Sequence, residues 1–101
     1  MKQYQYTIKG RGSMQNISFT AHLFKEADMF VAYVPELDLS SCGKTPEEAR
    51  TNIRDAVRGF LETASDNGTL DEILQEAGYE HHGKDWEAPE FVSLDRLTMT
   101  F

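Results

Sequence analysis

The periodicity of apolar residues changes once along this chain, near Thr45. Before that residue apolar and polar side chains alternate, most clearly over residues 17–23, which is the pattern of strands with one buried face. Beyond it apolar residues recur at spacings of three and four over residues 49–64, which is the pattern of an amphipathic helix. Strands followed by helices predict an α+β domain.

Capping residues predict where each helix begins and ends. Thr45 is a suitable N-cap, Pro46 occupies the first helical position, and Glu48 completes a capping box. Asn67-Gly68 predicts the end of this main helix. A second, shorter helix is expected to begin at Thr69 and to end before a glycine nine residues later.

The strands are expected on both sides of these helices. The segment "GRGS" at residues 10–13 predicts a turn between the first two strands. The segment "MFVAYV" at residues 29–34 is apolar on both faces, so we expect it in the middle of a sheet, covered on each face or by a partner subunit. Residues 79–90 have no regular pattern and are expected to be irregular. Apolar residues alternate over 91–101 and predict a last strand, with a shift of phase at Asp95-Arg96.

Length and composition predict a single domain spanning residues 1–101. No apolar run approaches the roughly 20 residues that a membrane span needs, and the N-terminus does not resemble a signal peptide. Cys42 is the only cysteine, which fits a reducing compartment. We therefore expect a cytoplasmic protein.

The net charge of −7 is concentrated in the last third of the chain. Residues 66–101 form an acidic extension with nine carboxylates against Lys84 and Arg96, and contain no recognisable DNA-binding segment. Such a region repels phosphate backbones and favours encounter with a basic protein surface. Solvation of the surface is the other interpretation of these charges.

Several patterns suggest chemistry but have a simpler explanation. Gly43-Lys44-Thr45 resembles the end of a phosphate-binding loop, yet Asp38 stands where that loop needs a second glycine. Cys42 precedes a helix without a base nearby in sequence, and a buried or half-buried structural cysteine is the better interpretation. His81-His82 are adjacent, so their side chains diverge rather than converge on a metal.

Charged residues offer further candidate sites. Glu36 and Asp38 share a face and could hold a divalent ion, although nothing else marks them. Arg50, Arg54 and Arg58 form a row on the main helix, but neighbouring carboxylates are close enough to neutralise it. Trp86, the only tryptophan, is either an interface anchor or part of the core. The residues themselves thus predict no catalytic set, no metal site and no cofactor.

The segment "FVAYVPELDLSSCGKTPEEARTNIRDAVRGFLE" resembles the HicB family of antitoxins. That family has a strand ending in Pro-(Asp/Glu)-Leu, a short loop bearing Cys, and Gly-x-(Thr/Ser)-x-Glu-Glu-Ala-x-x-Asn opening a helix. The resemblance covers residues 17–65, and the matching positions are Phe30, Val31, Pro35, Glu36, Leu37, Cys42, Gly43, Thr45, Glu47, Glu48, Ala49 and Asn52.

The resemblance implies a degenerate ribonuclease-H-like fold: an antiparallel sheet of three or four strands with the main helix packed on one face. With the short second helix and the C-terminal strand, this is the fold we expect. It also implies a non-catalytic protein that sequesters a small basic RNA-cleaving toxin (HicA-like) and forms homo-dimers or larger homo-oligomers.

Two surfaces are the expected interfaces. Asp71, Glu72 and Glu76 on the second helix would bind the basic partner, and Leu97, Met99 and Phe101 on the last strand would mediate self-association. Two alternatives stay open. One is a purely structural homo-oligomer, and the other is a weak metal-dependent nuclease that uses Glu36 and Asp38.

Overall fold

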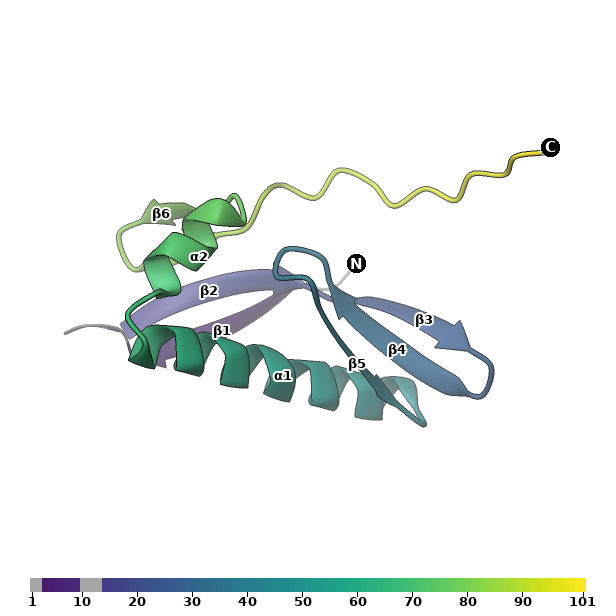
Figure 1. The fold of residues 1–101 in the computed structure, drawn as a ribbon, viewed down its shortest axis with the longest axis horizontal. Coiled ribbons are helices and arrows are strands. Elements are labelled where there is room, and N and C mark those ends of the chain that lie inside the picture. The colour runs from purple at the N-terminus through teal and green to yellow at the C-terminus, as the bar shows by residue number, and fades with distance from the viewer. Residues whose placement is uncertain (1–2, 10–13) are drawn as a thin grey trace.

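The computed structural model describes residues 3–9 and 14–101, so the predicted turn at residues 10–13 lies outside the described residues. The elements, in chain order, are β1 (Gln3–Lys9), β2 (Met14–Thr20), β3 (His22–Glu26), β4 (Met29–Val34), β5 (Leu39–Gly43), α1 (Pro46–Asp66), α2 (Leu70–Glu76), β6 (Glu80–His82) and β7 (Asp85–Glu87). Strands precede a main helix of 21 residues and a short second helix. The predicted α+β class is therefore confirmed (Figure 1).

The strands form two sheets, which adjoin where β2 is followed by β3. The first sheet has the order β1-β2-β7-β6 and the second has the order β3-β4-β5. Only Ala21 separates β2 from β3, so the two sheets follow each other along the same stretch of chain. All pairings are antiparallel except that of β2 with β7, which is parallel. The predicted antiparallel sheet of three or four strands is thus present, but as two sheets, one of which also contains a parallel pair.

Helix α1 lies across one side of both sheets and contacts β1, β4 and β5 (Figure 1). Its start matches the sequence prediction, because the Thr45 hydroxyl accepts a hydrogen bond from the Glu48 N–H at 3.0 Å and Pro46 begins the helix. The helix ends at Asn67, and Gly68 follows with φ of 73°. The positive φ explains why a glycine stands there.

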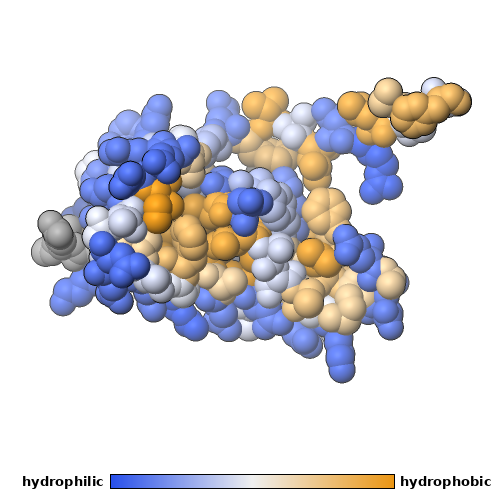
Figure 2. All heavy atoms as spheres, in the orientation of Figure 1, coloured by the Kyte–Doolittle hydropathy of each residue, from blue (hydrophilic) through white to orange (hydrophobic). Residues whose placement is uncertain are grey.

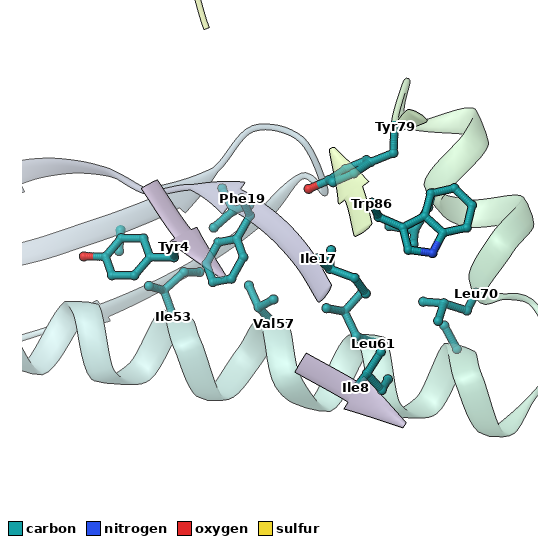
Figure 3. Packing of buried hydrophobic residues seen from close by; sticks show 14 of the residues in the cluster. Tyr4, Ile8, Ile17, Phe19, Ile53, Val57, Leu61, Leu70, Tyr79 and Trp86 are labelled. Atoms are coloured by element: carbon teal, nitrogen blue, oxygen red, sulfur yellow. The ribbon is translucent and has the colours of Figure 1, made fainter. Parts of the chain in front are cut away.

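The core is the layer between α1 and the sheets (Figure 3). Ile17 and Phe19 of β2 face Ile53, Val57 and Leu61 of α1, and all five are essentially inaccessible to water. Full burial of each such side chain contributes about 1.5–3 kcal/mol. The alternation of β2 and the 3–4 spacing of α1, both visible in the sequence, therefore meet in one core.

The segment after α2 is more ordered than the sequence suggested. Residues 79–90, predicted to be irregular, contain β6 and β7. Trp86 of β7 is only 1% exposed and its indole N–H donates to the Gln15 side chain at 2.6 Å. Trp86 is therefore a core residue that joins β7 to β2, which settles the choice between interface anchor and core.

The last strand was predicted at the wrong place. The C-terminal strands are β6 and β7, whereas residues 91–101 are extended without pairing to any described strand. Figure 1 shows this segment leaving the body of the molecule. It lengthens the molecule to 51 × 28 × 21 Å and gives a radius of gyration of 15.0 Å, where a compact chain of this length has about 13 Å. The alternation of apolar residues predicts an extended segment, but it does not show whether a sheet edge of the same chain is in reach to pair with that segment.

Candidate protein-interaction surfaces

The C-terminal segment, residues 91–101, is the most exposed apolar part of the described chain. Its large apolar side chains are all at least 37% exposed, and they are Phe91, Val92, Leu94, Leu97, Met99 and Phe101. In Figure 2 the outer part of this segment forms a hydrophobic arm that stands away from the body. Extended backbone with unpaired polar groups and apolar side chains is a ready template for pairing with another strand.

The three-stranded sheet has a second apolar face. On β4, Ala32 and Val34 are buried in the core, whereas Met29, Val31 and Tyr33 alternate with them, lie outside the core cluster and are half-buried. We call the side of β3-β4-β5 that carries these three residues the outer face. The predicted central position is confirmed, because β4 lies between β3 and β5. Its inner face is covered by the core, whereas its outer face is only half-buried within the described chain.

Phe24 extends the outer face to the edge of the sheet. It pairs with Val31 across the β3–β4 ladder and is 41% exposed. Sequence reasoning had not singled it out, although its place beside Leu23, whose side chain packs on the core, puts it on the opposite face of the strand.

The C-terminal segment starts beside β3. The rings of Phe91 and His22 meet edge to face, with centroids 5.8 Å apart. The His22 Nε2 atom is buried there and has no hydrogen-bond partner within residues 3–9 and 14–101. This contact fixes where the segment leaves the domain.

Asp71, Glu72 and Glu76 lie on α2 as predicted, and all three are exposed. None of them forms an ion pair with a described residue. Thr69, where this helix was expected to begin, precedes its first residue but does not cap it with its side chain, because the Thr69 hydroxyl donates to the Ala64 carbonyl. The acidic residues and the C-terminal segment form two separate surfaces.

The arginine row of α1 is engaged within the chain. Arg50 pairs with Glu47 at 3.6 Å and Arg58 with Asp55 at 3.0 Å, while the Arg54 guanidinium lies 4.8 Å from the centre of the Tyr4 ring. The expected neutralisation by neighbouring carboxylates is therefore confirmed for two of the three arginines. Such exposed pairs contribute little to stability, but they reduce the attraction of the row for phosphates.

Glu36 and Asp38 each have a structural role in the turn between β4 and β5. A Glu36 carboxylate oxygen accepts from the Thr20 N–H at 3.2 Å, and Asp38 accepts from the Tyr33 hydroxyl at 3.0 Å. This second bond, with burial and the Asp38 charge as smaller causes, raises the pKa of Tyr33 above its ordinary value. Within the described ranges no three His, Cys, Asp or Glu side chains gather as a metal site would require.

The remaining candidates have structural surroundings as well. Cys42 is exposed, so the expectation of a buried or half-buried cysteine is wrong: it alternates with the buried Gly43 at the end of β5. His81 stacks on Trp86 with centroids 4.1 Å apart, while His82 lies 3.3 Å from a Glu80 oxygen. The two imidazoles thus have different partners, as their adjacency in sequence suggested.

Two positions of the HicB-like motif join β5 to α1. The Asn52 side-chain N–H donates to the Cys42 carbonyl at 2.7 Å. A Cβ added to Gly43 would lie 2.6 Å from the Ala49 nitrogen, closer than real Cβ atoms come to backbone. The motif positions therefore hold the strand end tightly against the first turns of the helix.

No helix in residues 3–9 and 14–101 is long and apolar enough to cross a membrane. No family model matches the chain, and no curated protein or solved structure matches it significantly.

Proposed function

We propose that this protein is a HicB-like antitoxin: a non-catalytic binding module that sequesters a small basic RNA-cleaving toxin and associates with copies of itself. We also propose a cytoplasmic location, because a single cysteine that is exposed in the fold suits a reducing compartment.

The observation that carries this proposal is the charge of the lobe formed by α2, β6 and β7. Residues 70–87, from the start of α2 to the end of β7, contain six carboxylates and a single lysine or arginine, Lys84. Asp71, Glu72 and Glu76 are exposed on this lobe. Free carboxylates on one surface steer a basic protein toward it and exclude phosphate backbones.

The strand-to-helix junction supports the family assignment. Gly43, Thr45 and Asn52, three of the motif positions, each have a defined contact in the fold. The exposed C-terminal segment supports self-association, and it is also the observation that favours the second candidate function, a purely structural homo-oligomer.

The test is affinity isolation of the tagged chain from its native host, with identification of stoichiometric partners. The triple variant Asp71→Lys, Glu72→Lys, Glu76→Lys is expected to lose a small basic partner that the unaltered chain retains. Because lysines at a helix start are unfavourable, a second variant with Asn, Gln and Gln at these positions separates loss of charge from loss of the helix.

The matched control reverses three exposed charges elsewhere, with Asp28→Lys, Asp55→Lys and Glu62→Lys, none of which lies in the first turn of a helix. This control has the same net charge as the first variant and should keep the partner. Equal retention by all variants at moderate salt would overturn the assignment of the acidic lobe.

A further inference from the structure

We propose that residues 97–101 of one copy form a strand on the free edge of β3 in a second copy, so that two copies exchange their C-terminal segments. The inference rests on the self-association part of the proposed function and is independent of any toxin.

The receiving edge is open. In the described part of the chain β3 pairs only with β4, and its other edge has no strand partner. The strand Leu97–Phe101 and β3 both have five residues. Addition of a strand at such an edge satisfies backbone N–H and C=O groups of both chains.

The side chains fit the outer face. Leu97, Met99 and Phe101 alternate, so they share one face of an extended strand. In the phase that places them on the outer face they lie beside Phe24, next to the half-buried apolar side chains of β4. A shift of the pairing by one residue would turn these three side chains to the other face of the sheet. The apolar pattern therefore excludes every register that is offset by an odd number of residues.

The same chain cannot supply this strand directly. The segment starts where Phe91 contacts His22, at the first residue of β3. From there it runs along the molecule in the same direction as β3 (Figure 1). Since β3 ends at Glu26, a segment that advances about 3.3 Å per residue passes the end of β3 near residue 95. Residues 97–101 then lie beyond their own β3.

A return to the same β3 would need a reversal within residues 92–96. That stretch contains no glycine, proline or asparagine, so it lacks the residues that favour the two-residue turn of a hairpin. Ser93 and Asp95 also occur in turns, but here their side chains are bonded to each other at 3.0 Å. A second copy related by a two-fold axis needs no reversal, because each copy gives its segment and receives the other.

Charge favours the antiparallel arrangement. When Leu97 enters at the Glu26 end of β3, Arg96 comes next to the β3–β4 turn, where Glu26 and Asp28 are both exposed. Phe101 then reaches the His22 end, where Phe91 of the receiving copy lies. The only base of residues 91–101 thus meets two carboxylates.

The first test is the molar mass of the full chain in solution, by light scattering and sedimentation over a range of concentrations. We expect twice the chain mass of 11.5 kDa. Met99→Asp should weaken the dimer at least about tenfold, since it places a charge in the apolar contact. Thr98→Asp is the matched control on the opposite face and should weaken it less. A monomer at every concentration, or equal effects of the two variants, would overturn the proposal.

The second test distinguishes exchange from folding back. In a Cys42→Ser background, a tagged chain with Phe24→Cys is mixed with an untagged chain with Met99→Cys and oxidised. A disulfide between the two chains is expected, with little cross-linking when Thr98→Cys replaces Met99→Cys. A chain carrying both cysteines that cross-links only within itself would overturn exchange. A dimer that forms as described but binds no toxin would contradict the proposed role of the acidic lobe and would leave the strand exchange supported.

Discussion

The side chain of Asn52, in the second turn of α1, donates a hydrogen bond to the backbone carbonyl of Cys42 in β5 at 2.7 Å. The bond spans the loop that turns the last strand of the second sheet into the main helix. Together with the Thr45 cap on the same loop, it ties the end of β5 to the first turns of α1.

Asn52→Ala is expected to lower the free energy of unfolding by about 1 kcal/mol, because a backbone carbonyl loses its side-chain donor. Thr51→Ala, at the neighbouring exposed position, should change it by less than about 0.5 kcal/mol. Urea titration followed by circular dichroism measures both. Equal values for the two variants would show that the bond does not hold the junction.

Two glycines give opposite predictions for the same substitution. Gly43→Ala should destabilise the fold by about 1–3 kcal/mol, because its Cβ would meet the backbone of Glu48 and Ala49 at 2.9 Å or less. Gly59→Ala, in an open position of α1 with no atom within 4 Å of the added Cβ, should stabilise it by about 0.5–1 kcal/mol. Thermal unfolding of the pair checks both signs, and a stabilising Gly43→Ala would contradict the packing.

Tyr79 makes stability depend on pH in the alkaline range. Burial, with the charge of Glu36 as a second cause, raises the pKa of this phenol above its ordinary value. The folded state therefore favours the neutral form: its contribution is complete below the unfolded pKa of about 10 and is lost as pH rises above that value.

Tyr79→Phe should lower stability at neutral pH by about 1 kcal/mol, because the hydroxyl donates to the Ser18 carbonyl at 2.6 Å. Its unfolding free energy should then fall less steeply above pH 10 than that of the unaltered chain. Denaturant titrations at neutral and alkaline pH measure the difference. Parallel pH profiles would show that Tyr79 does not titrate with unfolding.

Trp86 reports on the lobe that carries the acidic residues. Trp86→Ala removes a fully buried side chain and the indole bond to Gln15, so we expect a loss of about 3–5 kcal/mol. In the unaltered chain the single indole should show the blue-shifted fluorescence of a buried tryptophan and little quenching by iodide. Strong quenching in the native state would place Trp86 at the surface instead.

Local patterns predicted most of the fold because they are physically self-contained. The cap at Thr45, the end of α1 before Gly68 and the alternation of β2 each depend on neighbours within a few residues. Strand pairing depends on distant residues, and here sequence reasoning failed: β7 forms because Trp86 finds a site beside β2, and residues 91–101 lack a partner strand within the described chain.

The candidate surfaces also divide into those set by local patterns and those set by strand pairing. Exposure of Asp71, Glu72 and Glu76 could be predicted from the apolar face of a short helix. Phe24 and the open edge of β3 could not, since they depend on which strands are neighbours in the sheet. The exposure of Cys42 depends on the same information, because the phase of β5 is set by its pairing with β4.

The central claim, that this chain neutralises an RNA-cleaving partner, is tested most directly by a cleavage assay. A small basic protein that co-purifies with the chain is separated from it in denaturant, refolded and incubated with RNA, alone and with increasing amounts of the chain. The account predicts cleavage by the partner alone, suppression at a stoichiometric amount of the unaltered chain, and no suppression by the triple lysine variant. A partner without RNA-cleaving activity, or cleavage that continues in a stable complex, would contradict it.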